Sequence, residues 1–189
     1  MSSLPIFRAH ALAAALVACA TVPLVSQQDA ETPEQVAARY VQAMRSRQWD
    51  SMAVLMHPVA LHQLREVLGP LFESPTMDSA RQELLGVPTL AQARALSDTA
   101  VFVALISRIM VSQAQLQDLM HDATIQVLGH VPEGQDTVHV VYRMSYEKGP
   151  AAISKMAVFS MLRMGNTWRG LLAMDLRMLG AMLRRAAGT

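Results

Sequence analysis

Apolar positions in the C-terminal half of the chain alternate with polar ones or run on continuously, as is typical of β-strands. The breaks between these runs contain Gly, Pro, Asn or Asp and are short enough for hairpin turns. The runs cover residues 123–131, 136–146, 151–163 and 167–174. The pattern therefore predicts an antiparallel meander of about four strands that forms a curved sheet.

The N-terminal half begins with helical spacing. Thr32 can cap a helix, Pro33 suits its first position, and Gln35 completes a capping box. The apolar positions that follow fall on one helical face, at Val36, Tyr40, Val41 and Met44. We expect this face to pack against the sheet, which makes the predicted fold class α+β.

Two more helices are predicted before Gly69. The first begins at Asp50, whose carboxylate can cap the following amides, with Trp49 as a hydrophobic staple. His57 and Pro58 end that helix and start the next one. The apolar stripe of this next helix consists of Leu61, Leu64, Val67 and Leu68.

Residues 70–122 form a predicted helical insertion, with helices over 78–85 and from Ser97 to about Met120. Charged residues interrupt the longer helix, which disfavours a membrane span. As a hypothesis, the insertion is a lid over an apolar cavity at the open end of the sheet; the alternative is added core helices without gating. A C-terminal helix is predicted over 175–187, although Gly180 lowers its helix propensity.

The first 26 residues resemble an export signal, with Arg8 before an apolar run too short to cross a bilayer comfortably. Cys19 sits in a sequence that resembles a lipobox, so the alternatives are lipidation there, cleavage by ordinary signal peptidase, and a segment retained as an anchor. Residues 27–31 are a predicted tether, and 32–187 a single domain. We expect an exported protein, in the periplasm or anchored to the outer membrane as a lipoprotein.

Composition narrows the partner classes. The formal net charge is +1, so no long-range field would attract nucleic acid or an anionic membrane. Cys19 is the only cysteine, so the domain after the signal can hold neither a disulfide nor a thiolate ligand. The 14 methionines indicate a soft, adaptable interior.

The helix, polar turn, Trp-Asp and helix sequence of residues 32–68, followed by the meander of 123–174, resembles the nuclear transport factor 2-like (SnoaL-like) superfamily. This resemblance implies a cone-shaped α+β domain. The superfamily includes small-molecule isomerases, dehydratases and cyclases, many non-catalytic binding domains, and many dimers. The fold alone does not choose among these functions.

Side-chain alternation assigns the faces of the sheet. In the second strand the inward set is Val138, Val140, Tyr142, Met144 and Tyr146. If Val127 lies opposite Val140, His130 and His139 share the outer face with Arg143. Two histidines without a carboxylate beside an arginine are a poor zinc set, so we expect no metal and no other cofactor.

The predicted inner face lacks Asp, Glu and His, and tyrosine is a poor base at neutral pH. We therefore expect a non-catalytic domain that binds an apolar small molecule or a protein partner. In the first case the expected ligand contacts are Tyr40, Met44, Trp49, Met56, Val140, Tyr142 and Met144. In the second, a homodimer would use an outer face containing Val141, Phe159 and Met161.

The alternative is an isomerase- or dehydratase-like enzyme with a base at the mouth of the cavity. His57, Asp50 and Tyr142 are its candidate catalytic residues, because an imidazole oriented by a carboxylate is a general base at neutral pH. This alternative predicts that the three side chains converge on one cavity.

Overall fold

A computed structural model of the protein describes residues 31–113, 122–148, 151–172 and 175–188. The predicted export signal, Cys19 and most of the tether therefore lie outside the described residues, as do 114–121 of the longer insertion helix and 149–150 of the second predicted turn. No helix within the described ranges is both long and apolar enough to cross a membrane.

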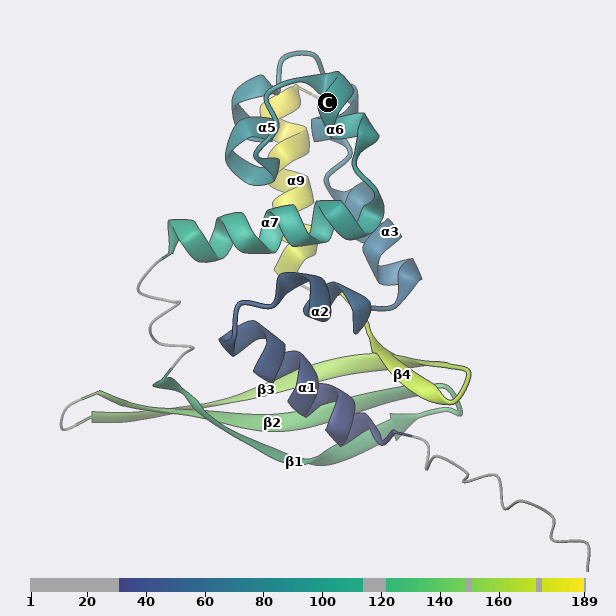
Figure 1. Ribbon diagram of the computed structural model, residues 1–189, viewed down its shortest axis with the longest axis vertical. Helices are drawn as coiled ribbons and strands as arrows, with labels where there is room; N and C mark the ends of the chain where they lie inside the picture. The colour runs from purple at the N-terminus through teal and green to yellow at the C-terminus, as the bar shows by residue number, and fades with distance from the viewer. Residues whose placement is uncertain (1–30, 114–121, 149–150, 173–174, 189) are drawn as a thin grey trace, which may run out of the picture.

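The molecule is elongated, with a four-stranded sheet at one end and a helical body at the other (Figure 1). This arrangement confirms the predicted α+β class and the C-terminal helix. The helices are α1 (Pro33–Arg45), α2 (Trp49–Val54), α3 (Pro58–Val67), α4 (Pro70–Glu73), α5 (Asp78–Leu85), α6 (Leu90–Ala95), α7 (Asp98–Ser112) and α9 (Asp175–Ala187). The strands are β1 (Thr124–Glu133), β2 (Thr137–Lys148), β3 (Ala151–Met164) and β4 (Thr167–Gly170).

The sheet is an antiparallel meander in the order β1-β2-β3-β4, as the sequence pattern predicts. Helix α1 lies across its inner face, where it contacts β1, β2 and β4 (Figure 1). A small core fills this interface and consists of Val36, Ala37, Leu55, Val138, Val140 and Met161. The capping box at Thr32 is formed as predicted, which fixes where α1 begins.

The helical body has a separate and larger core, to which α2 to α7 and α9 contribute. Helix α7 makes its main contacts with α2, α3 and α5, and none of the main contacts of α4 to α7 is with the sheet. The described part of the 70–122 insertion therefore builds core between helices, which favours the alternative to a lid.

Two single residues determine how the helices of this body are held together, Arg81 in α5 and Gly180 in α9. Arg81 of α5 is fully buried and donates hydrogen bonds to the carbonyl oxygens of Leu71 and Ser74 at 3.1 and 2.7 Å, and to the Asp78 carboxylate. Helix α9 approaches α3 at Gly180, where a Cβ would lie 2.7 Å from the carbonyl oxygen of Val67.

The predicted start of the second helix is wrong by one residue. Helix α2 begins at Trp49 with Gln48 in the cap position, and no side chain caps it. Asp50 is exposed in the first turn, where its negative charge faces the positive end of the helix dipole.

The predicted register of β1 is also wrong: the hairpin is tighter than predicted, with Glu133 opposite Thr137, and the strand contains a β-bulge between Val127 and Gly129. Val127 lies opposite Tyr142, and His130 lies opposite Val140. The extra residue moves everything after it to the other face. His130 is therefore on the inner face and does not share the outer face with His139.

The dimer face predicted from the sequence is also partly wrong, as the pairing of β3 with β2 shows. Phe159 pairs with Val140 and Met161 pairs with Val138, so both are inner-face residues. Of the three residues predicted for the outer face, only Val141 lies there, opposite Val158. Phe159 instead stacks on Tyr40 of α1 with ring centroids 4.4 Å apart.

Candidate functional site: the outer face of the sheet

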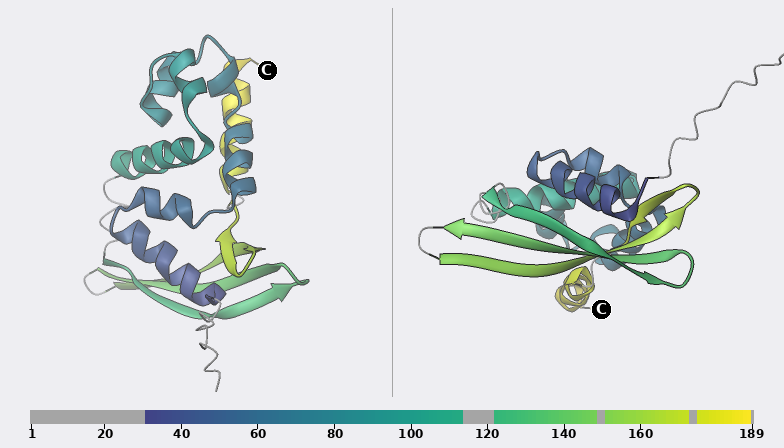
Figure 2. Two further views of the ribbon diagram at one scale, coloured as in Figure 1. Left: turned by 45° about the vertical axis from the view of Figure 1, so that its right-hand side comes forward. Right: turned by 90° about the horizontal axis from the view of Figure 1, so that it is seen from below.

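Helix α1 provides the main helical contacts of the sheet, and it covers only the inner face, so the other side is left without a covering helix in the described structure. Seen from below, the sheet faces the viewer and the helices lie behind it (Figure 2, right). Alternation along β2 and β3 places His139, Val141, Arg143, Met156 and Val158 on this side. We call this surface the outer face.

Exposed apolar side chains are concentrated on the outer face. Five of the nine large hydrophobic residues that are exposed in the described ranges belong to the sheet, and they are 43% to 59% exposed. These five are Leu128, Val131, Met156, Val158 and Met164, of which Leu128 is the extra residue of the bulge and the other four lie on the outer face by alternation. Single exposed hydrophobic residues are normal on protein surfaces, but a cluster on one flat face indicates an interaction surface.

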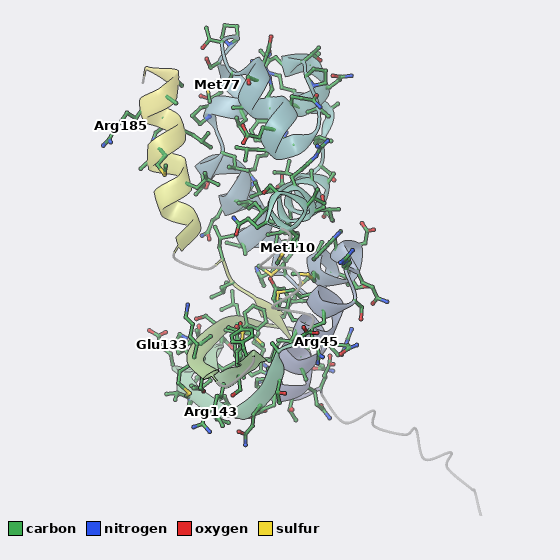
Figure 3. The ribbon with its side chains drawn as sticks, turned by 90° about the vertical axis from the view of Figure 1, so that its left-hand side faces the viewer. Arg45, Met77, Met110, Glu133, Arg143 and Arg185 are labelled. Atoms are coloured by element: carbon green, nitrogen blue, oxygen red, sulfur yellow. The ribbon has the colours of Figure 1, made fainter. Side chains whose placement is uncertain are left out.

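Among the described side chains, alternation places three charged residues on this face: Glu133, Arg143 and Arg169, which lies opposite Leu162. Glu133 ends β1, and Arg143 lies opposite Gln126 and Met156 in the middle of the sheet. Arg143 projects from the bottom of the sheet, away from the helical body, and Glu133 lies at the side of the sheet opposite α1 (Figure 3). Glu133 and Arg169 lie in one row across the four strands, so that end of the face carries both a negative and a positive group.

A chain of hydrogen bonds also lies on the outer face. His139 Nε2 is 2.7 Å from a carboxylate oxygen of Glu133, and its Nδ1 is 2.9 Å from the Ser160 hydroxyl. Because a carboxylate can only accept, Nε2 donates to Glu133, and in the neutral ring Nδ1 accepts from Ser160. Sequence alternation could have paired His139 with Ser160, but the bulge that brings Glu133 to this face left no signal in the pattern.

This Ser-His-Glu order resembles the arrangement of a hydrolase, but the remaining requirements are missing from the described structure. The main chain at Ser160 is held in the sheet, because Ser160 pairs with His139 and its carbonyl accepts from Leu171 N–H at 2.8 Å. An oxyanion hole needs free, convergent donors beside the nucleophile. We interpret the three residues as a row of hydrogen-bonded polar side chains on an otherwise apolar face, in which each side chain fixes the orientation of the next.

The inner face carries an ionisable pair that the sequence analysis missed. His130 Nδ1 lies 2.5 Å from Glu34 Oε1 of α1, so the prediction that no imidazole faces inward is wrong. The hydrogen bond from His130 lowers the pKa of Glu34, and partial burial opposes this effect. Both side chains are about one third exposed at the border of the sheet, so the pair connects α1 to β1 at the rim.

Three phenol groups also lie at this interface, Tyr142 and Tyr146 on the inner face of β2 and Tyr40 on α1. Burial raises the pKa of Tyr40 strongly, with a further contribution from Tyr142. Burial also raises the pKa of Tyr142 and that of Tyr146. These phenols are therefore neutral at physiological pH, and deprotonation is harder than for a free tyrosine.

The three candidate catalytic residues come from different elements. Asp50 is exposed on α2, and Tyr142 is on the inner face of β2. His57 is the N-cap of α3, where its Nδ1 accepts from Val59 N–H at 3.1 Å. None of the three lines either of the two described pockets.

Five of the seven residues expected to bind an apolar ligand lie in or against the two cores. Val140 and Met56 are buried, and Tyr40 stacks on Phe159. Met44 and Trp49 pack partly buried against the helical core, while Tyr142 and Met144 lie on the inner face. None of the seven lines either described pocket.

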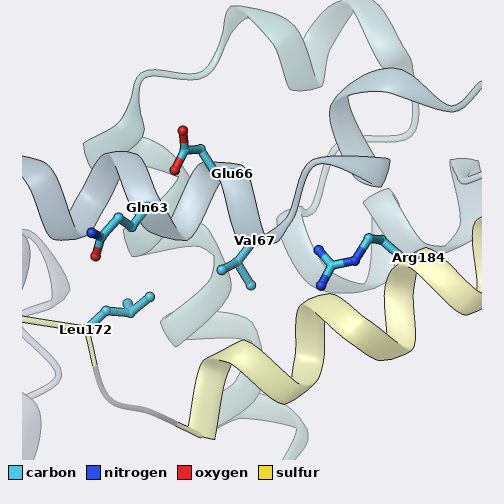
Figure 4. A pocket seen from close by; sticks show the side chains of 5 residues that line it. All are labelled: Gln63, Glu66, Val67, Leu172 and Arg184. Carbon is cyan, nitrogen blue, oxygen red and sulfur yellow. The ribbon is translucent and has the colours of Figure 1, made fainter. Parts of the chain in front are cut away.

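The two described pockets lie on the helical body. The larger, about 410 Å³, is lined by Gln63, Glu66 and Val67 of α3 with Leu172 and Arg184 (Figure 4). The smaller, about 300 Å³, lies along α3 and α4 and shares Glu66 with the first. Both contain charged side chains, so neither matches the apolar cavity that the sequence predicts under the sheet.

Comparison of the chain with protein-family models, with curated proteins and with solved structures finds no match.

Proposed function

We propose that this protein is a non-catalytic interaction domain whose partner is a second copy of itself, bound through the outer face of the sheet. The observation that supports this proposal most directly is the set of four exposed apolar residues that alternation places on one side of the sheet, Val131, Met156, Val158 and Met164. When two copies pack through this face, each copy buries the same set of apolar residues, so the apolar area removed from water is double that of one copy.

A face-to-face arrangement suits the geometry of the sheet. Two sheets pack about 10 Å apart when the side chains of their facing sides interdigitate. In a two-fold pair whose axis runs across the strands near Val141 and Val158, Arg143 of each copy is directed toward the half of the other copy that carries Glu133 and Arg169. The formal net charge of +1 adds little repulsion between copies.

The order of elements supports two further parts of the proposal. Helices followed by a four-strand antiparallel meander are the arrangement of the nuclear transport factor 2-like superfamily, and we place the chain there as a proposed member. The sequence of residues 1–26 supports export, so the self-association is proposed to occur in the periplasm or at the cell envelope.

Sedimentation velocity over a wide range of protein concentration tests the association. The chain without residues 1–26 should change from the monomer mass to twice that mass as concentration rises. Val158→Glu should abolish the dimer, because it places a carboxylate in the apolar cluster. Val54→Glu is the matched control, since Val54 is equally exposed, at 61%, but lies on α2.

Two results would overturn the proposal. One is a monomer at every concentration. The other is an equal loss of association in the Val54→Glu and Val158→Glu variants, because the effect would then depend on added charge and not on the outer face.

A further inference from the structure

The borders of the sheet differ in how they are protected. The outer border of β4 is occupied, because Gly170 N–H donates to Leu55 O and His57 N–H donates to Gly170 O, both at 2.8 Å. The border formed by β1 contains a bulge, Pro132 and the charged Glu133. Bulges, prolines and charges are the devices with which proteins prevent unwanted pairing at sheet edges.

Strand β3 has a long border without such devices. Strand β4 pairs with β3 only from Met161 to Met164, although β3 begins at Ala151. Within the described ranges, no strand pairs with β3 before Met161 on that side. This half of β3 forms a free border of the sheet (Figure 2, right). It contains no proline and no bulge, and Lys155 is its only charged residue.

The direction of the unpaired main-chain groups follows from two hydrogen bonds. Ser160 O accepts from Leu171 N–H, so Ser160 presents its main-chain groups to the β4 side. Arg163 N–H donates to Asp136 O, so odd-numbered residues face β2. Because these directions alternate along a strand, Ser154, Met156 and Val158 present their N–H and C=O groups to the free border.

The side chains beside this border specify what can pair there. Met156 and Val158 lie on the outer face and are 49% and 59% exposed. Lys155 lies on the opposite face and is exposed. Apolar residues pair favourably with Met156 and Val158 across strands, and an acidic residue pairs favourably with Lys155.

We propose that the free border of β3 binds an extended segment of a partner protein as an added β-strand. The segment would lie beside β3 in the position that β4 would occupy if it continued past Leu171. The segment runs antiparallel to β3, as β4 does. It alternates apolar residues, which extend the outer face, with acidic residues on the side of Lys155. Main-chain hydrogen bonds supply the affinity, and alternate side chains supply the specificity.

Fluorescence anisotropy with a labelled synthetic peptide tests this site. The probe Thr-Val-Glu-Val-Glu-Val-Thr places valines opposite Ser154, Met156 and Val158, and a glutamate opposite Lys155. The same peptide with lysine in place of glutamate is the control. We expect saturable binding of the glutamate peptide and binding about tenfold weaker for the lysine peptide, which corresponds to about 1.4 kcal/mol.

Variants separate the main-chain edge from the side chains. Val158→Pro and Met156→Pro each remove one N–H from the free border and leave the hydrogen bonds to β2 in place, a position where strands tolerate proline. Both should abolish peptide binding while the far-ultraviolet circular dichroism remains unchanged. Val158→Thr keeps the N–H and should bind the peptide within about twofold of the unmodified protein.

Charge reversal at Lys155 gives a readout that a structural role would not produce. Lys155→Glu should exchange the preference, so that the lysine peptide binds more tightly than the glutamate peptide. The proposal is overturned if the unmodified protein does not bind the glutamate peptide, or if either folded proline variant binds it normally.

Mass measured on the same samples keeps this inference distinct from self-association. A monomer that binds the peptide contradicts only the proposed function, whereas a dimer that does not bind it contradicts only the added strand.

Discussion

His130 and Glu34 are 96 residues apart in sequence, and the imidazole Nδ1 of the first lies 2.5 Å from the carboxylate of the second. Glu34 is in the first turn of α1, and His130 follows the bulge of β1. The pair therefore connects the helix that covers the inner face to the border strand of the sheet.

The contribution of this pair to stability should depend on pH. The hydrogen bond from His130 lowers the pKa of Glu34 below its ordinary value of 4.5, so ionised Glu34 stabilises the folded state. This contribution is fully present above pH 4.5 and is lost as the pH falls through the lower pKa of the folded state. Glu34→Gln should cost about 0.5–1 kcal/mol at about pH 6.

Urea unfolding at several pH values measures this effect. The difference between Glu34→Gln and the unmodified protein should shrink steadily below pH 4.5. A difference that stays constant from neutral to strongly acidic pH would show that the carboxylate is not stabilised by its hydrogen bond. Glu31→Gln is the comparison variant, because it removes a carboxylate near the start of α1 whose partner, at 2.6 Å, is Arg39 and not a histidine.

The bulge should require glycine at position 129. Gly129 has a φ of 139°, outside the left-handed helical region that asparagine can adopt, and a Cβ added there would meet no atom within 4 Å. Gly129→Asn should therefore cost about 1–3 kcal/mol from the backbone alone. Gly165 is also open but has a φ of 61°, so Gly165→Asn should cost less than about 0.5 kcal/mol. Thermal unfolding compares the two, and equal costs would contradict the assigned backbone conformation.

Gly180 should resist replacement even by the best helix former. Alanine is favoured over glycine in helices by about 1 kcal/mol, but its Cβ would lie 2.7 Å from Val67 O and 2.8 Å from Val67 Cγ1. We expect Gly180→Ala to destabilise the protein by about 1–3 kcal/mol in urea unfolding. Adding Val67→Ala should recover part of this loss, because it removes the Cγ1 contact and leaves the carbonyl. A stabilising effect of Gly180→Ala would show that α9 does not approach α3 this closely.

Arg81 should stabilise the helical body through its guanidinium group. Arg81→Met keeps most of the apolar length but leaves the carbonyls of Leu71 and Ser74 without their donor. The expected cost is about 2–4 kcal/mol, measured by chemical unfolding. Asp78→Asn should cost only about 1 kcal/mol, because the Asp78 side chain is 69% exposed and water can replace it. If both variants lower the free energy of unfolding by the same amount, Arg81 stabilises the protein mainly through its ion pair with Asp78 and not through the two carbonyl contacts.

The sequence was most informative where local chemistry decides the structure. The capping box of Thr32 and Gln35 fixes the start of α1 without reference to the rest of the chain. The turn residues around Gly165 and the alternation along β2 likewise depend on near neighbours, so the meander and the faces of β2 could be predicted.

The predictions were wrong where contacts between residues far apart in the sequence determine the structure. An extra residue in a strand does not change the apolar pattern of β1 enough to be seen, so the inward position of His130 and the outward position of Glu133 were missed. Gly180 looked unfavourable in a helix. Glycine is needed there because the chain passes close to a carbonyl oxygen of α3, and the sequence of α9 does not show this contact. Strand β4 ends at Gly170 and not at Met174, although its apolar run continues.

The bulge makes the number of residues between Val127 and His130 more important than their identity. Substitution at Leu128 alters one side chain, whereas loss of that residue would exchange the histidine and the glutamate between the interior and the surface in a single step. Length variation at this position is thus a heritable route by which descendants of this chain could acquire an acidic or a basic surface without changing their topology.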